Sequence, residues 1–109
     1  LGGDVHRHVA AHLRERPDDP RSRIVASEFV CSSITSRGVS EAVMEMMRRA
    51  NPDLVHARSD ERGYALIDVT AGSADCEFRA TPFPARPGER LSTQARVSVE
   101  SGRPGVALA

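Results

Sequence analysis

The second half of the chain alternates apolar and polar residues, and this two-residue period most constrains what the chain can fold into. Cys76, Phe78 and Ala80 alternate with charged residues. In a β-strand, such alternation turns one face toward the core and the other toward water. Residues 71–74 are typical of a hairpin connection. Further segments with strand character are residues 54–57, 64–69 and 93–99. The sequence therefore predicts a mostly antiparallel arrangement of strands.

Clusters of proline, glycine and short polar residues divide these segments. Residues 81–90 contain three prolines and one glycine, which predicts a loop. Residues 17–20 contain two prolines and also predict a loop. Residues 60–63 predict a polar turn before the strand segment 64–69. We expect regular structure to end at residues 101–105, where two glycines flank an arginine and a proline.

One segment, residues 40–50, has the period of a helix. Ser40 is a suitable N-cap, with Glu41 in the first turn and two arginines in the last. Asn51 and Pro52 then end the helix. An apolar stripe follows the helical spacing and is expected to pack into the core; it consists of Val39, Val43, Met46, Met47 and Ala50. With the strands, this single helix predicts an α+β fold.

The first half of the chain is less regular. Residues 7–15 fit a helix and a strand equally well, because apolar residues satisfy both spacings. Residues 23–31 favour a strand covered on both faces, since branched and aromatic residues occur on both of its sides. Glu28 lies inside this run. A carboxylate buried there is either hydrogen-bonded for structural reasons or part of a site.

The segment with the most chemical character is Gly2-Gly3-Asp4-Val5-His6. If its backbone is extended, Asp4 and His6 project to one side and Val5 turns into the core. A carboxylate and an imidazole that converge from one segment suit a hard or borderline metal ion. The two glycines allow a tight turn and a close approach to a ligand. Asp4 and His6 are therefore the candidate metal ligands.

The other histidines and the two cysteines give weaker indications of a functional site. His8 and His12 would adjoin on a helix, but without the glutamate of a zinc-protease motif we interpret them as polar surface residues. Cys31 and Cys76 share no metal-ligand spacing, and we interpret them as small buried apolar residues. A disulfide between them stays open at this stage, because it depends on a distance that the sequence does not give.

Composition narrows the class of protein. Lys and Arg number 15, and so do Asp and Glu, so the formal net charge is zero and no basic surface for nucleic acid is indicated. Aromatic residues make up 4% with no Trp, which argues against a platform for stacking bases. No apolar run reaches the length of a membrane span. The 109 residues suffice for one small core.

Five short stretches, spread over nearly the whole chain, carry a family resemblance. They are Gly3-Asp4-Val5-His6, Val25–Val30, Ser33–Ser36, Arg62-Gly63-Tyr64 and Val99–Gly105. In order and spacing they resemble the C-terminal portion of the alkaline phosphatase D family, also called PhoD-type phosphatases and phosphodiesterases. The resemblance implies part of a metallophosphoesterase-like β-sandwich flanked by helices. It also implies that Asp4 and His6 match the family's late metal-binding motif.

The resemblance carries expectations about function. Members of the family are typically exported enzymes that use iron and calcium to hydrolyse phosphomonoesters and phosphodiesters. Residues 1–109 would then be the C-terminal segment of one catalytic domain, with a phosphate ester as substrate and the N-terminal portion of the same protein as structural partner. Alone, the segment is expected to be inactive, because two side chains cannot complete a site for two metal ions. The alternative is a freestanding α+β binding or interaction module that keeps the scaffold without the chemistry.

Overall fold

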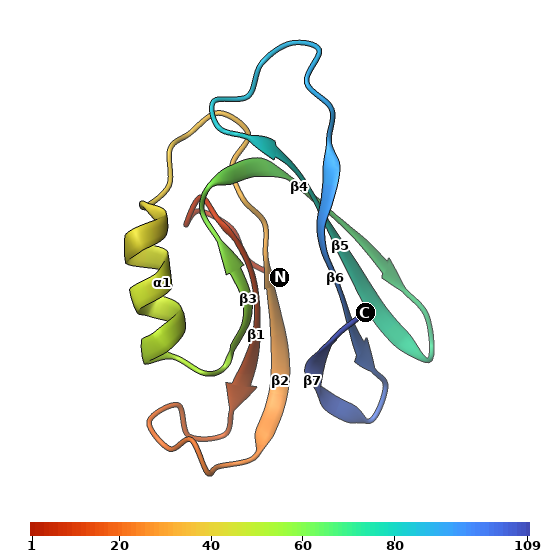
Figure 1. The fold of residues 1–109 in the computed structure, drawn as a ribbon. Coiled ribbons are helices and arrows are strands. Elements are labelled where there is room, and N and C mark those ends of the chain that lie inside the picture. The colour runs from red at the N-terminus through yellow and green to blue at the C-terminus, as the bar shows by residue number, and fades with distance from the viewer.

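The computed structural model describes all of residues 1–109 and contains two β-sheets and one α-helix (Figure 1). In chain order, the elements are β1 (His8–Arg14), β2 (Ile24–Val30), α1 (Glu41–Ala50), β3 (Leu54–Arg58), β4 (Glu61–Val69), β5 (Ser73–Pro82), β6 (Ser92–Glu100) and β7 (Arg103–Leu108). One sheet has the strand order β2-β1-β3 and the other the order β4-β5-β6-β7. All neighbouring strands in both sheets are antiparallel. The predicted α+β class with mostly antiparallel strands is confirmed.

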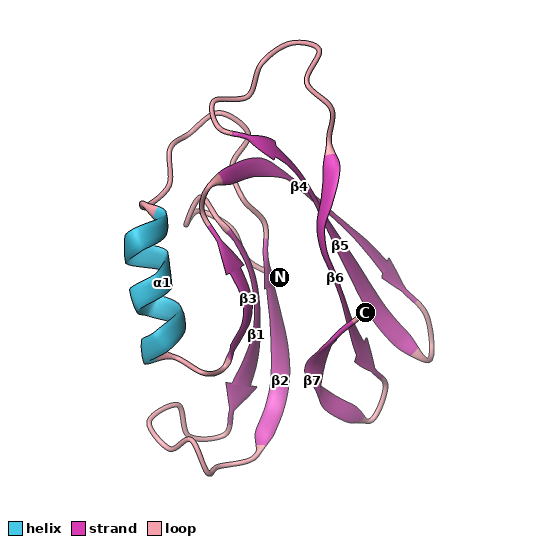
Figure 2. Cartoon of the chain, in the orientation of Figure 1, coloured by secondary structure: helices cyan, strands magenta, loops and turns pink.

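The structure has three layers, with α1 outside the three-stranded sheet and the four-stranded sheet on its other side (Figure 2). The core between the two sheets consists of Ala10, Phe29, Cys76, Phe78, Val97 and Val106. A second cluster lies between the three-stranded sheet and the helix, and consists of Val9, Ala11, Val30, Met44 and Ala57. Each layer therefore buries an apolar face against the next one.

Strand β1 is the central strand of its sheet and belongs to both clusters. Ala10 faces the four-stranded sheet, whereas Val9 and Ala11 face the helix. Residues 8–11 are all buried. The ambiguity between helix and strand at residues 7–15 is thus resolved in favour of a strand, because a two-residue period serves both covered faces of β1.

The start of the chain lies along the outer edge of β2. Gly2 forms a parallel bridge with Val30. The Gly2 amide donates to the Phe29 carbonyl at 2.9 Å, and the Cys31 amide donates to the Gly2 carbonyl at 3.1 Å. These two hydrogen bonds place the segment that follows Gly2 beside the end of β2.

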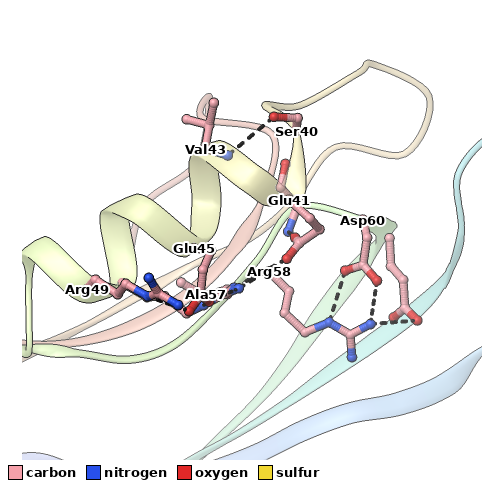
Figure 3. Close-up of polar contacts among 11 residues, drawn as sticks. Ser40, Glu41, Val43, Glu45, Arg49, Ala57, Arg58 and Asp60 are labelled. Atoms are coloured by element: carbon pink, nitrogen blue, oxygen red, sulfur yellow. Dashed lines mark hydrogen bonds and ion pairs between the residues drawn. The ribbon is translucent and has the colours of Figure 1, made fainter.

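Helix α1 begins as predicted. The Ser40 hydroxyl accepts a hydrogen bond from the Val43 amide at 3.3 Å, with Glu41 in the first turn and Arg48 and Arg49 in the last (Figure 3). An ion pair joins Arg49 and Glu45 at 3.0 Å. The N-cap satisfies one of the free amides at this end of the helix.

The prediction that the apolar stripe of α1 packs into the core is wrong for most of its residues. Met46 is 70% exposed and Val43 42% exposed, whereas Val39 packs against the second cluster.

Met44 is the buried residue of the helix. Beside it, the Arg48 guanidinium donates to the Ala57 carbonyl of β3 and bridges Glu41 and Glu45. The helix therefore turns Met44 and these polar groups toward the sheet, and most of the apolar stripe stays exposed.

Several boundaries in the second half differ from the predictions. Strand β5 spans Ser73–Pro82, so it takes in two residues of the predicted hairpin connection 71–74 and two of the predicted loop 81–90. Strand β4 begins at Glu61, so residues 61–63 are strand and not turn. Regular structure continues beyond residue 101, because β7 pairs with β6 and buries Val106. Gly102, with φ of 77°, provides the turn between these strands. Pro104 is tolerated because β7 is an edge strand.

Both cysteines are free thiols. Cys76 is buried in the core as predicted, and this burial, together with the charge of Cys31, raises the pKa of its thiol to about 11. Cys31 is only partly buried. The interpretation as buried apolar residues therefore holds fully for Cys76 alone.

Two histidines, His8 and His56, pack on Phe78 in the core. Their burial is expected to make the stability of the fold depend on pH. Burial lowers the pKa of both His8 and His56. His56 also donates to the Gln94 side chain at 2.7 Å. In the unfolded chain these imidazoles have their ordinary pKa of about 6.5, so on acidification they bind protons there before they do in the folded chain. The free energy of unfolding therefore falls as the pH drops below about 6.5 toward the lower pKa of the folded state.

We expect His56→Gln to weaken this pH dependence. Urea unfolding followed by circular dichroism at pH 7.5 and pH 5.5 provides the measurement. The loss of stability between these two pH values is expected to be smaller in the variant than in the parent chain. An identical loss in both would show that His56 is not a source of the effect.

Candidate functional site

The candidate ligands lie in a bend and not in an extended segment. Residues 4–7 form this bend directly before β1. Asp4 and His6 have positive φ angles of 70° and 55°. Asp and His are among the residue types that adopt this left-handed conformation most often, although it costs about 1–3 kcal/mol. Val5 is 39% exposed, so the prediction that it turns into the core is wrong.

His6 is held by its ring. Its Nδ1 atom lies 2.8 Å from the Arg37 carbonyl oxygen. A carbonyl oxygen only accepts, so Nδ1 donates this hydrogen bond, and Nε2 is the ring nitrogen without a partner in the chain. Histidines that bind metals usually have this arrangement, with one ring nitrogen bonded to a carbonyl or carboxylate and the other on the metal.

The Asp4 carboxylate is exposed and forms no ion pair or hydrogen bond within the chain. It is therefore free to bind an external cation. No group of three or more His, Cys, Asp or Glu side chains is placed to hold a metal ion. Asp4 and His6 therefore belong to no cluster of three such side chains within residues 1–109.

A buried arginine joins the bend to the rest of the domain. Arg62, near the start of β4, is 1% exposed. Its Nη1 donates to the His6 carbonyl and, at 2.8 Å, to the Ser32 hydroxyl. Its Nη2 donates to the Ser59 carbonyl at 2.6 Å. We refer to these four residues and Gly38, which packs against them, as the Arg62 cluster.

Arg62 forms no ion pair with a carboxylate, and its Nε atom has no hydrogen-bond partner. Burial lowers its pKa, yet a guanidinium stays charged at neutral pH. An isolated buried charge costs on the order of several kcal/mol. Neutral oxygen acceptors and the Phe83 ring, whose centroid lies 5.4 Å from the guanidinium carbon, compensate part of this cost.

Gly38 closes the Arg62 cluster from the side of the loop before α1. A Cβ atom at this position would lie 2.5 Å from the His6 carbonyl oxygen, 2.4 Å from the Ser59 hydroxyl and 2.9 Å from Arg62 Nη2. Only glycine permits such a close approach. The Arg37 carbonyl that holds the His6 ring belongs to the preceding residue, so this packing also fixes that acceptor.

Helix α1 anchors the same region. One Glu41 oxygen accepts from the Ser59 amide at 2.6 Å, at the junction of β3 and β4. Arg58 pairs with Asp60 at 2.6 Å in the same turn (Figure 3). The start of the helix, the loop before it and the turn after β3 are therefore held together around His6.

The prediction that His8 and His12 are surface residues is wrong for His8. His8 is fully buried, its Nδ1 accepts from the Ser32 amide at 3.1 Å, and its ring lies 4.7 Å from that of Phe78. His12 is partly buried and accepts from the Val106 amide at 3.1 Å. Four residues apart on a strand, the two residues have Cα atoms about 13 Å apart, so their rings are not placed as a pair of ligands for one metal ion.

Glu28 is not the hydrogen-bonded structural carboxylate that was one of its two expected roles. It is half-buried, with no ion pair or hydrogen bond within the chain. It lines a groove of about 440 Å³ between the start of the chain, the three-stranded sheet and α1. Other residues of this groove include Gly2, Val30, Met44 and Met47, but not Asp4 or His6. Val5 and Arg7 of the bend line the groove, so it reaches the bend although neither candidate ligand lines it.

Comparisons with known proteins agree with one another. Residues 1–78 match the PhoD-like phosphatase family. The chain belongs to this family. It is 32% identical to alkaline phosphatase D of Bacillus subtilis (strain 168), over 97% of the chain and 18% of that protein. A solved structure of PhoD superimposes with a TM-score of 0.84 and 29% identity, over 98% of the chain and 21% of that structure.

The comparisons confirm the resemblance to the C-terminal portion of the PhoD family. The chain spans about a fifth of the length of these relatives. It is therefore comparable to a part of a PhoD-like phosphatase and not to a whole one. Its single helix has ten residues, and no helix is long and apolar enough to cross a membrane.

The three residues of the PhoD-like motif Arg62-Gly63-Tyr64 have different surroundings. Arg62 binds the bend. A Cβ on Gly63 would lie 1.9 Å from the Arg79 carbonyl oxygen, so glycine is required at this position, where β4 pairs with β5. Tyr64 is 38% exposed. The sequence alone did not indicate Arg62 or Gly38 as residues of the candidate site. Arg62 does belong to one of the motifs that carry the family resemblance.

We expect Gly38→Ala to destabilise the domain by about 1–3 kcal/mol, because the added methyl overlaps backbone and side-chain atoms of the Arg62 cluster. Gly72→Ala is the matched control, since its nearest neighbour, the Thr70 hydroxyl, would be 3.9 Å from the new Cβ. Urea unfolding of both variants provides the measurement. Equal stability of the two would show that the packing around Gly38 relaxes freely.

Proposed function

We propose that residues 1–109 form the C-terminal part of a metal-dependent phosphoesterase and that Asp4 and His6 are metal ligands in the complete enzyme. The observation that carries this proposal is the His6 ring. Its Nδ1 is bonded to the Arg37 carbonyl at 2.8 Å, which leaves Nε2 free. Membership of the PhoD-like phosphatases supports the phosphate-ester substrate class.

The chemistry of the donors fits this role in part. An exposed carboxylate and an imidazole nitrogen suit a hard or borderline cation, such as the calcium and iron implied by the family resemblance. When bound, such ions polarise phosphoryl oxygens and lower the pKa of a bound water. Within this chain, Asp4 would supply a negative oxygen ligand, and His6 a nitrogen ligand whose orientation is fixed by its second nitrogen.

The rest of the ligand set is proposed to come from the N-terminal portion of the same protein, which is also the expected structural partner. The apolar stripe of α1 supports this, because its exposed residues lie beside the groove that Gly2 and Met47 line. Contiguous exposed apolar residues commonly mark a surface that other protein covers. Export from the cell follows from the family resemblance and remains part of the proposal.

We expect Asp4→Ala and His6→Ala, each made in the complete enzyme, to lower metal content and turnover together. Removing groups that only support ligands costs about 10–100-fold in metal affinity, so loss of a ligand itself should cost at least that much. Elemental analysis by mass spectrometry and hydrolysis of p-nitrophenyl phosphate and bis-p-nitrophenyl phosphate provide the measurements.

Asp18→Ala is the control for these variants, because Asp18 is exposed in the loop between β1 and β2. It should leave both readouts unchanged. Full metal content and normal turnover in both Asp4→Ala and His6→Ala would contradict the ligand assignment.

A second test addresses the surface of α1. In the complete protein, Met46→Lys should lower the melting temperature by several degrees, because a charge would be buried against the N-terminal portion. Val69→Lys is the matched control, since Val69 is 71% exposed and Met46 is 70% exposed. Equal melting temperatures for the two variants, measured by differential scanning fluorimetry, would show that the stripe of α1 faces solvent.

A further inference from the structure

We propose that Arg62 is a positioning residue for the metal site and that its guanidinium holds His6 in the conformation that binds metal. The inference rests on the proposed role of His6 as a ligand and assigns a function to a buried charge outside the ligand set. Arg62 lies 56 residues from His6 in the sequence, yet its Nη1 donates directly to the His6 carbonyl.

The first argument is the partner set of Arg62. A buried arginine that serves stability alone is usually paired with a carboxylate. Arg62 binds instead the His6 carbonyl, the Ser32 hydroxyl and the Ser59 carbonyl. These oxygens belong to three separate segments: the bend before β1, the loop after β2, and the turn between β3 and β4. The guanidinium thus places the bend relative to two other segments of the domain.

The second argument is that His6 is fixed at two points, and both depend on the Arg62 cluster. Arg62 holds the backbone carbonyl of His6, and the Arg37 carbonyl holds its ring. Gly38, next to Arg37, packs against Arg62 Nη2 and the His6 carbonyl oxygen. Because His6 also has a positive φ of 55°, the bend needs such contacts to keep this conformation.

The third argument concerns the geometry of the guanidinium. Its two terminal nitrogens donate in different directions within one plane, and the Phe83 ring lies over it with the centroid 5.4 Å away. A lysine ammonium has one nitrogen on a flexible stem and cannot reproduce this fork. The charge alone is therefore not sufficient, and Arg62→Lys separates geometry from charge.

The experiment compares Arg62→Met, Arg62→Lys and Arg96→Lys in the complete enzyme. Arg96 is the control, because it is exposed on β6 and pairs with Glu77, away from the bend and the Arg62 cluster. Iron and calcium content after graded dialysis against EDTA gives the apparent metal affinity. Thermal unfolding identifies variants that are folded. Rates of bis-p-nitrophenyl phosphate hydrolysis are then measured with and without added iron and calcium.

We expect both Arg62 variants to lose about 10–100-fold in metal affinity, as for other groups that orient a ligand, and Arg96→Lys to lose none. Added metal should restore much of kcat with little change in KM, which a purely structural defect would not show. If Arg62→Met does not fold, Arg62→Lys decides the question. Parental metal affinity in the folded Arg62 variants would overturn the inference.

Failure of this inference can be distinguished from failure of the proposed function by His6→Ala in the same assay. If His6→Ala loses metal and the Arg62 variants keep it, His6 is a ligand and Arg62 does not position it. If His6→Ala also keeps its full metal content, the ligand assignment itself is wrong, and the inference about Arg62 falls with it.

Discussion

The candidate site depends on the hydrogen bonds that the buried Arg62 guanidinium donates. It has no carboxylate partner, so the energy of burying its charge is offset by oxygens from three separate segments and by the Phe83 ring. One of these oxygens belongs to His6, the residue with the most evident ligand geometry. The bend at the start of the chain is thus ordered by a residue of the second sheet, and the two-sheet fold is a precondition for the site.

The layered fold explains how β4 brings Arg62 to this place. Strand β1 is buried on both faces, with Val9 and Ala11 toward the helix and Ala10 toward the second sheet. His8, on the same side as Ala10, contacts Phe78 of β5 and the Ser32 amide. The segment just before His8 is therefore held against the second sheet, where β4 begins. Strong packing of β1 thus places the bend within reach of the arginine.

Much of the fold was predictable because local patterns determine it. Alternation identified most strand segments, and Ser40 marked the start of the helix. Other features depend on contacts that no local pattern contains. The apolar stripe of α1 has ideal spacing, yet Met44, outside the stripe, is the buried residue of the helix, and Arg48 contacts Ala57 and Glu45 beside it. The burial of His8, the bend at Asp4 and His6, and the Arg62 cluster arise from residues far apart in the sequence. The residue types of the site were predictable, but their conformation was not.

Three features of the structure are incomplete within residues 1–109, and they lie close to one another. Asp4 and His6, the proposed metal ligands, have no third such side chain beside them, most of the apolar stripe of α1 is exposed, and a groove beside Gly2 lies between the start of the chain and the helix. Each feature alone has a simple local explanation. Together they fit one cause, because a further layer of protein over the groove would cover the stripe and bring donors toward the bend. A domain completed in this way would bind its metals between two parts of the chain, so that metal binding and the docking of the two parts would stabilise each other.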